Sequence, residues 1–253
     1  MKWKDRSLEG KTILVTRPKE QAEPLITRIK ERGGIPLSFP VVSIKGAKNV
    51  LKEKILDDLS SFHWIIFTSK NGVDYFFQLI NDLDVSLQNH KFAAVGEKTA
   101  DTLRRYGVTS ILVPGRFDAS DLAEVLKKQV LKDERILFPK GNLAPSYLKE
   151  SLADIAHVEE LIVYETTSAV DLDWSLPEKA DCFFFLSPSA VSFMMKQDAI
   201  KHNSTIYKTP VFCIGPTTKA SAEKSGFLHV FMPNNFTAED MVNCAISYFQ
   251  GGR

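Results

Sequence analysis

The sequence predicts an α/β protein built from two similar units, each a parallel sheet flanked by helices. Compact apolar runs repeatedly end in small polar residues and lead into segments of helical periodicity, which is typical of parallel sheets. Several motifs of the first half also recur in the second half at an almost constant offset. With 253 residues, 44% of them hydrophobic and 25% charged, the chain has a globular composition and enough length for two small domains.

The first elements are expected to be a strand, a helix and a second strand. Residues 11–16 form a compact apolar run that ends before Pro18, and helical spacing of apolar residues then continues to Gly33. Residues 35–44 form a second extended run, which prolines interrupt. This order predicts a βαβ-like opening.

The same order of elements recurs further along the chain. A strand is expected at 63–68 with a helix at 73–79, and another strand at 92–95 with a helix at 100–106. The carboxyl ends of parallel strands share one edge of a sheet. The polar turns between these strands and helices are therefore expected where such sheets bind ligands.

The chain is predicted to be a tandem duplication with halves of about 125 residues. The matching segments are 67–73 with 185–191, 95–99 with 214–218, 113–114 with 232–233, and 117–122 with 236–241. Ser187 follows Ser69 by 118 positions, and the other three pairs are 119 positions apart. A weaker similarity relates 12–17 to 135–140. Two similar units presented edge to edge leave a cleft, which is a preferred place for a ligand.

Hydroxyl-bearing residues occupy the turns at the ends of the expected strands. They are Thr16 beside Arg17, Ser69, Thr99, Ser187 with Ser189, and Thr217 with Thr218. Each hydroxyl could simply cap a helix, which contributes about 1 kcal/mol of stability. Together they would gather helix N-termini and hydroxyls at one edge, where anions are favoured. The sequence therefore predicts a small anionic ligand that carries several charges.

Two other residues are candidates for the site. Tyr164 interrupts an apolar run, and is either a core residue with its hydroxyl at the rim or a site residue. Lys140 stands beside Gly141 at the end of an expected strand, and is either a mobile cation of the site or an ordinary surface lysine. The neighbouring Glu159 and Glu160 are expected in a solvated turn rather than as an acid–base pair.

Several other functional classes are excluded. Thirty-two Lys+Arg against 31 Asp+Glu leave a charge of +1, so no general positive field would attract nucleic acid or a membrane. The sequence lacks the Gly-rich nucleotide motifs, the histidine motifs of metal sites and the serine-hydrolase elbow. Cys182, Cys213 and Cys244 form no CxxC pair and are expected in the core of a protein from a reducing compartment. No apolar run has the length of a signal peptide or membrane span, so a cytoplasmic location is expected.

The order and spacing of the motifs resemble those of the uroporphyrinogen-III synthase family. The segments that carry the resemblance are 15–18, 67–72, 95–100, 161–166, 185–189 and 214–218. The chain departs from the pattern at Leu186, where the first copy has Thr68, so no hydroxyl role is assigned there. It also departs at Lys219, where the family often has alanine.

The resemblance implies an enzyme that needs neither cofactor nor metal. Such an enzyme closes hydroxymethylbilane to uroporphyrinogen III, with loss of water and inversion of ring D through a spiro intermediate. The resemblance further implies two domains that are not divided at mid-chain. Residues 1–40 with 167–253 would form domain one, 45–162 domain two, and hinge strands would run through 40–44 and 161–166.

The resemblance also implies roles for individual residues. Tyr164 would be the general acid that helps the terminal hydroxyl of the substrate to leave. The substrate would be bound by Thr16, Arg17, Ser69, Thr99, Lys140, Ser187, Ser189, Thr217 and Thr218. The expected state is a monomer whose partner is this small-molecule substrate. Two alternatives remain open: a non-catalytic two-lobed protein that binds a polyanion, and a regulatory protein of the same fold that has lost turnover.

Overall fold

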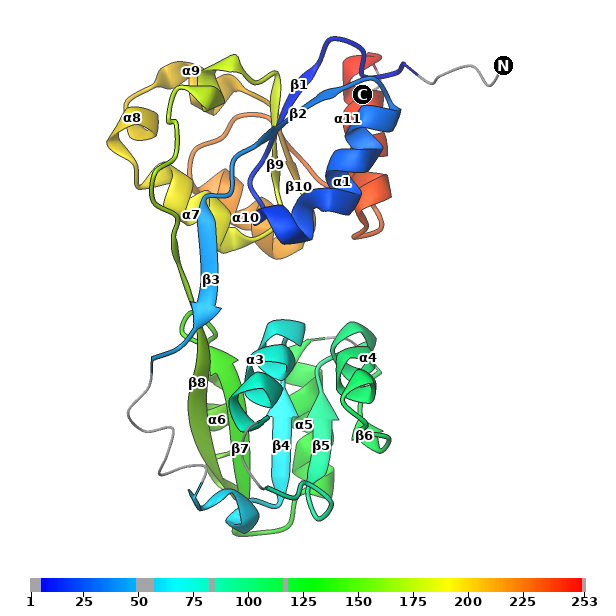
Figure 1. Ribbon diagram of the computed structural model, residues 1–253, viewed down its shortest axis with the longest axis vertical. Coiled ribbons are helices and arrows are strands. Elements are labelled where there is room, and N and C mark those ends of the chain that lie inside the picture. Colours follow the sequence, from blue (N-terminus) through cyan, green and yellow to red (C-terminus); the bar gives the residue numbers. More distant parts are fainter. Residues whose placement is uncertain (1–5, 49–56, 82–84, 116–117, 252–253) are drawn as a thin grey trace. The chain divides into compact units, whose positions relative to one another are not determined.

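The computed structural model describes residues 6–48, 57–81, 85–115 and 118–251 (Figure 1). Contacts divide the chain into two compact units: unit 1 is Met1–Ser43 with Thr167–Arg253, and unit 2 is Ile44–Thr166. Each unit has its own sheet and its own hydrophobic core. Phe117, which begins one of the recurring segments, lies outside the described residues.

Unit 1 is built on a parallel sheet with the strand order β11-β10-β9-β1-β2. The strands are β1 (Thr12–Val15), β2 (Ile35–Ser38), β9 (Cys182–Phe185), β10 (Val211–Cys213) and β11 (Val230–Phe231). The helices are α1 (Lys19–Glu31), η2 (Leu176–Lys179), α7 (Pro188–Met195), α8 (Asp198–Lys201), α9 (Ser204–Lys208), α10 (Pro216–Lys224) and α11 (Ala238–Phe249). Helices α1 and α11 cover one face of the sheet, and α7 and α10 cover the other (Figure 1).

Unit 2 contains a sheet with the strand order β3-β8-β7-β4-β5-β6. The strands are β3 (Val42–Gly46), β4 (Trp64–Phe67), β5 (Lys91–Ala94), β6 (Ile111–Leu112), β7 (Glu134–Gly141) and β8 (Ala156–Ser168). The helices are η1 (Leu59–Ser61), α3 (Lys70–Ile80), α4 (Glu97–Arg105), α5 (Ala119–Gln129) and α6 (Tyr147–Leu152). Helices α3 and α4 pack on one face of the sheet, and α5 and α6 pack on the other.

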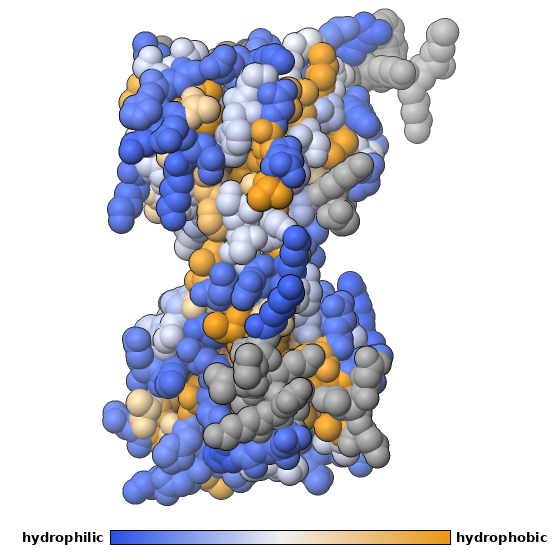
Figure 2. All heavy atoms as spheres, turned by 60° about the vertical axis from the view of Figure 1, so that its left-hand side comes forward, coloured by the Kyte–Doolittle hydropathy of each residue, from blue (hydrophilic) through white to orange (hydrophobic). Residues whose placement is uncertain are grey.

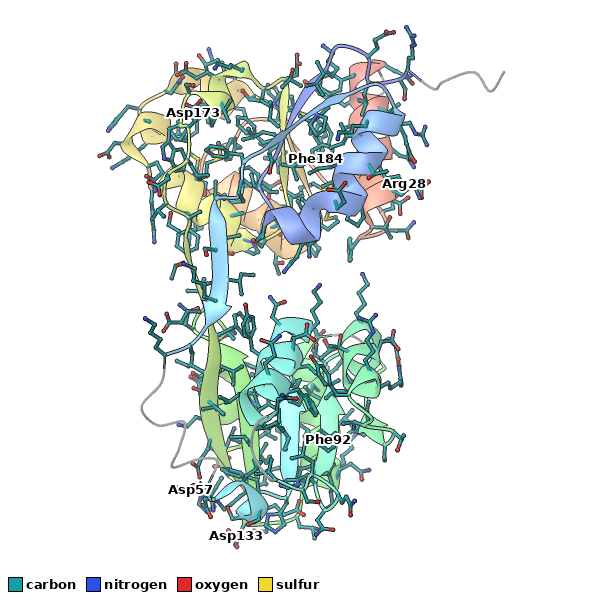
Figure 3. All side chains as sticks on the ribbon, viewed as in Figure 1. Arg28, Asp57, Phe92, Asp133, Asp173 and Phe184 are labelled. Atoms are coloured by element: carbon teal, nitrogen blue, oxygen red, sulfur yellow. The ribbon has the colours of Figure 1, made fainter. Side chains whose placement is uncertain are left out.

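Alternate residues of the central strands enter opposite cores, because side chains of a strand alternate between its faces. In β9, Phe184 packs with α1 and α11, whereas Phe183 and Phe185 pack on the side of α7 and α10. Figure 3 labels Phe184 inside unit 1 and Phe92 of β5 inside unit 2. Strands that are buried on both faces read as continuous apolar runs, which is why these segments stand out in the sequence.

The two units repeat one another down to the register of their strands. Val211 of β10 pairs with Phe183 of β9, and the matching residues of unit 2, Phe92 and Ile65, pair in the same way. The strand orders β11-β10-β9-β1-β2 and β6-β5-β4-β7-β8 correspond one to one. The predicted tandem duplication is therefore confirmed.

The extended run expected at 35–44 is two strands rather than one. Strand β2 pairs with β1 in the sheet of unit 1, as the predicted βαβ opening requires, whereas β3 belongs to the sheet of unit 2. Pro40 lies between them and has no N–H to donate to a sheet ladder, which accounts for the break.

The chain passes between the units twice, once within β3 and once within β8. The two strands are antiparallel, because the N–H of Ala47 donates to the carbonyl of Val163 and the N–H of Ala169 donates to the carbonyl of Val41, both at 3.0 Å. The sheet of unit 2 is therefore mixed, with one antiparallel strand at its edge.

Hydrophilic side chains cover most of the coloured surface in Figure 2, and apolar side chains appear there in smaller patches. In the part of the chain that the structure describes, no helix combines the length and the apolar character needed to cross a bilayer.

Candidate active site

The carboxyl ends of the strands gather the predicted polar residues at one edge of each sheet. They are Thr16 and Arg17 after β1, Ser187 after β9 and Thr217 after β10 in unit 1, and Ser69 after β4, Thr99 after β5 and Lys140 at the end of β7 in unit 2. Asp57 and Asp133, labelled in Figure 3, lie at the opposite edge of unit 2. The edge that carries the polar turns is the one at which open α/β sheets bind ligands.

Ser69 and Ser187 cap their helices in the same way. Ser69 Oγ accepts a hydrogen bond from the N–H of Gly72 at 3.0 Å, and Ser187 Oγ accepts one from the N–H of Ala190 at 3.2 Å. The capping alternative is therefore confirmed for both serines. Each oxygen nevertheless has a second hydroxyl beside it, which for Ser187 is Ser189 Oγ at 3.0 Å.

For Ser69 the second hydroxyl belongs to Tyr164, a half-buried residue of β8. The Tyr164 Oη lies 3.3 Å from Ser69 Oγ, and its ring stacks on Tyr75 with centroids 5.6 Å apart and planes 25° apart. Tyr75 Oη donates to the carbonyl of Ile44 at 3.2 Å. Burial raises the pKa of Tyr75, and the nearby carboxylate of Asp74 raises it further. Unit 2 thus holds a tyrosine and a serine hydroxyl together at the carboxyl edge of its sheet.

Thr16 and Arg17 have their polar groups engaged within unit 1. Thr16 is fully buried, and its Oγ1 donates to the carbonyl of Phe184 at 2.8 Å, so the hydroxyl joins β1 to β9 instead of facing a ligand. The guanidinium of Arg17 donates to Gln21 Oε1 from Nε at 3.2 Å and from Nη2 at 3.1 Å. Burial lowers the pKa of Arg17. An arginine nevertheless stays charged at neutral pH.

Lys140 is neither a mobile cation nor a surface lysine. Its side chain is 5% exposed, and Nζ donates to Glu160 Oε1 at 2.9 Å and to Ser146 Oγ at 3.4 Å. Nζ also lies 5.5 Å from the centroid of the Phe138 ring, on the face that packs against α5 and α6. The prediction of a solvated turn at Glu159 and Glu160 is wrong, because both residues lie within β8. A buried ammonium requires a counter-charge, which Glu160 supplies.

The remaining predicted residues lie in the first turns of helices. Thr99 and Thr218 are buried at the third positions of α4 and α10. Thr217 is exposed at the second position of α10, and Ser189 is partly exposed at the second position of α7. Glycine caps both α4 and α10, which leaves the N–H groups of their first turns without a capping side chain. Thr217 and Ser189 are therefore better placed for a ligand than Thr99 and Thr218.

Two residues beside Tyr164 carry no sequence signal. One is Tyr75, and the other is Asn142, whose N–H donates to the carbonyl of Tyr164 at 3.2 Å. Asn142 Oδ1 accepts from the N–H of Thr166 at 2.8 Å, and its Nδ2 donates to the carbonyl of Thr166 at 3.3 Å. Both residues reach Tyr164 only through tertiary packing, so no local motif indicates them.

Cys182 and Cys213 are buried as predicted, whereas Cys244 is only partly buried. Burial raises the pKa of all three thiols, that of Cys213 to about 12. Such thiols are protonated at neutral pH and are poor nucleophiles. Within residues 6–48, 57–81, 85–115 and 118–251, no three His, Cys, Asp or Glu side chains are grouped so that they could hold a metal ion.

Comparison with known proteins gives a consistent result. The sequence profile of the family described as uroporphyrinogen-III synthase HemD matches residues 23–243. The uroporphyrinogen-III synthase of Chlorobaculum parvum is 31% identical over 240 residues, which cover 89% of this chain and 94% of that protein.

Solved structures show the same fold. A mutant uroporphyrinogen III synthase of Thermus thermophilus superposes with a TM-score of 0.68 at 16% identity, covering 96% of this chain and 100% of that one. The uroporphyrinogen-III synthetase of Helicobacter pylori gives a TM-score of 0.60 at 18% identity, covering 94% and 99%. These similarities confirm the predicted α/β fold. The profile match and the Chlorobaculum relative favour the predicted enzyme over a polyanion-binding or regulatory protein, and they show that this chain belongs to the uroporphyrinogen-III synthase family.

Proposed function

We propose that this protein converts hydroxymethylbilane into uroporphyrinogen III as a cofactor-independent lyase, with loss of water and inversion of ring D through a spiro intermediate. The observation that carries the proposal is the pair of Tyr164 and Ser69 hydroxyls, 3.3 Å apart, at the carboxyl edge of a sheet in a chain of this family. The requirement on the protein is to hold the ends of a flexible substrate in one reactive pose, which is an effect of orientation.

The substrate is a polycarboxylate, and both units present groups that suit it. In unit 1 these are Ser187, Ser189, Thr217 and Thr218, with the guanidinium of Arg17; in unit 2 they are Ser69 and Thr99. The first turns of α4 and α10 add backbone N–H groups, which attract anions together with the positive end of the helix dipole. Thr16 and Lys140 stabilise the fold and do not bind the substrate directly, because their polar groups already have buried protein partners.

Tyr164 is the proposed general acid. Its phenol transfers a proton from Oη to the terminal hydroxyl of the substrate as the carbon–oxygen bond breaks, so that water leaves and an azafulvenium cation remains beside the phenolate. A hydrogen bond donated by Ser69 stabilises the phenolate oxygen that results. The substituted carbon of ring D attacks the azafulvenium cation to give the spiro intermediate, which fragments. Reclosure through the unsubstituted α carbon of the inverted ring then releases the proton of that carbon, which balances the proton that the phenol gave.

The proposal includes the organisation of the whole chain. Residues 1–40 with 167–253 and 45–162 act as the two domains, and 40–44 and 161–166 act as hinge strands. The protein works as a monomer in the cytoplasm, and the tetrapyrrole substrate is its partner.

The test supplies the purified protein with fresh hydroxymethylbilane, oxidises the products and resolves the porphyrin isomers. The expected result is the type III isomer, above the type I isomer that forms in a control without enzyme. Tyr164→Phe should lower kcat by about 10²-fold, because general acid catalysis contributes at least that much in many enzymes. If the protein only binds the substrate, the ligand will raise its melting temperature without changing the isomer ratio, and the proposal will be wrong.

A further inference from the structure

We propose that Gly141 and Asn142, the turn that ends β7, are positioning residues that aim the Tyr164 hydroxyl at Ser69 and the substrate. The proposed role concerns the aim of one side chain and not the binding of substrate. Its kinetic consequence rests on the proposed function, whereas the position of the phenol can be measured without any activity.

A β-bulge places Tyr164 on its face of the sheet. Lys140 pairs with Ile162, but the next residue, Gly141, pairs with Tyr164, so Val163 is the extra residue of β8. Without the bulge, side chains would alternate and Tyr164 would point away from the face that Val163 enters. Both side chains instead pack with the core under α3. Re-aiming a side chain in this way is a common use of bulges beside active sites.

Gly141 provides the space that the re-aimed ring occupies. A Cβ added to Gly141 would lie 2.5 Å from Tyr164 Cε2 and 2.7 Å from Tyr164 Oη, which no real contact tolerates. Gly141 is buried, and its φ lies outside the left-handed region. The need for glycine is therefore one of space beneath the phenol, not of backbone conformation.

Asn142 holds the strand that carries the tyrosine. Its N–H bonds to the carbonyl of Tyr164, and its side-chain amide makes one hydrogen bond in each direction with the backbone of Thr166. The amide thus continues the β7–β8 ladder beyond the last backbone pair. A bulge weakens the ladder locally, and these bonds restore it on the far side of Tyr164.

The phenol is then bounded on three sides within unit 2. Gly141 lies beneath the ring, Tyr75 stacks against it, and Ser69 lies beside its hydroxyl. In unit 1 the β1–β2 ladder ends at the pair Val15 and Ser38. By the offset of 123 positions, Lys140 and Gly141 correspond to Arg17 and Pro18, which lie beyond that ladder. Among the described strand pairs β1–β2 and β7–β8, the bulge is therefore present only in the longer β7–β8 ladder, which carries the tyrosine.

Gly141→Ala is expected to lower kcat by about the same factor as Tyr164→Phe, roughly 10²-fold, and to change KM by less than about threefold. The double variant Gly141→Ala with Tyr164→Phe should be no slower than Tyr164→Phe alone, because a ring without its hydroxyl gains nothing from correct aim. Asn142→Ala should give a smaller loss of kcat with the same lack of additivity. Losses that multiply in the double variants, or wild-type kcat in Gly141→Ala, would overturn the proposal.

Gly46→Ala is the matched control. Gly46 lies in β3 of the same sheet, and a Cβ there would lie 3.7 Å from the Tyr75 ring, which is an ordinary contact. This variant should keep wild-type kcat and KM. A loss equal to that of Gly141→Ala would show that any added methyl group disturbs the site, and would contradict the proposal.

A second measurement needs no substrate. The protein is prepared with carbon-13 at tyrosine Cζ, and the signal of Tyr164 is assigned by its absence in Tyr164→Phe. Gly141→Ala should shift that signal, and Gly46→Ala should leave it in place. If the wild-type protein forms no type III isomer, the proposed function is wrong. The carbon-13 signal still tests whether Gly141 positions the Tyr164 ring. An unmoved Tyr164 signal in Gly141→Ala overturns the positioning role, whatever the enzyme assay shows.

Discussion

Ser69 serves two purposes with one oxygen atom. It accepts the N–H of Gly72 at the start of α3 and lies 3.3 Å from Tyr164 Oη. A hydroxyl can accept one hydrogen bond while it donates another. Helix capping and the orientation of the phenol therefore depend on the same side chain, and a substitution at Ser69 should affect both stability and rate.

Ser69→Ala is expected to destabilise the protein by about 1 kcal/mol, the usual cost of losing an N-cap. It should also lower kcat by about 10- to 150-fold, since a hydrogen bond to a charged group such as the phenolate contributes about 1.5–3 kcal/mol. Thr237→Ala is the matched control, because Thr237 Oγ1 accepts the N–H of Asp240 at the start of α11. Urea unfolding should show similar losses of stability for both variants. An equal loss of kcat in Thr237→Ala would refute the second role of Ser69.

Glu134 should make the stability of unit 2 depend on pH. Burial by itself raises the pKa of its carboxyl group, but hydrogen bonds from the N–H of Leu131, from Lys91 and from the Trp64 indole outweigh burial and lower it. The folded pKa then lies below the unfolded one. The carboxylate's contribution is complete above the ordinary value of about 4.3 and is lost as the pH falls through the folded pKa.

Glu134→Gln should therefore cost about 2 kcal/mol of stability at pH 7, since hydrogen bonds to a charged group are worth about 1.5–3 kcal/mol. The difference from the wild-type protein should shrink as the pH falls below about 4. Urea unfolding of both proteins, followed by tryptophan fluorescence between pH 3 and pH 7, measures this difference in the free energy of unfolding. A difference that stays constant over this range would contradict the prediction.

At the scale of elements, the duplication extends to the way that helices end. Helices α4 and α10 are followed by Gly107 and Gly226, which lie 119 positions apart and have φ of +86° and +96°. In both, the glycine N–H and the next N–H donate to carbonyls of the last helical turn. This is the left-handed C-cap in which glycine avoids the strain that a Cβ introduces.

Gly107→Ala is expected to cost about 1 kcal/mol, because a Cβ there meets no atom within 4 Å and only the left-handed backbone is strained. Gly226→Ala should cost about the same, since its φ is likewise left-handed and its Cβ would lie 3.4 Å from the Tyr207 ring, which is an ordinary contact. Gly115→Ala is the control, because it has open space and a φ outside the left-handed region. Chemical unfolding of the three variants checks the order, and an equal cost for all three would disprove it.

At the scale of the molecule, the two units have separate cores. The buried clusters beneath α1, α7, α10 and α11 contain only residues of unit 1, and those beneath α3, α4, α5 and α6 contain only residues of unit 2. Local stability follows buried apolar contacts. A cavity in one core should therefore leave the other unit largely unaffected.

Ile65→Ala tests this separation. Ile65 is fully buried in β4 of unit 2, and truncating such a residue usually costs about 2–5 kcal/mol. Hydrogen exchange followed by mass spectrometry should show faster exchange in peptides from β4, β5 and β7 and unchanged exchange in peptides from β9 and β10. Faster exchange throughout unit 1 would mean that the two cores unfold as one.

The sequence by itself determined the features that depend on local spacing. The apolar runs, the polar turns after them and the helix caps at Ser69 and Ser187 follow from residue types a few positions apart, and the duplication follows from repeating them. The tertiary structure alone decided which hydroxyls remain available. Thr16 bonds to a strand 168 residues away, and Lys140 finds Glu160 across the β7–β8 pair. Strand pairing sets these contacts, and a single bulged residue sets the face of Tyr164. Neither leaves a periodic trace in the sequence, because a one-residue shift of register changes the face of every side chain that follows it.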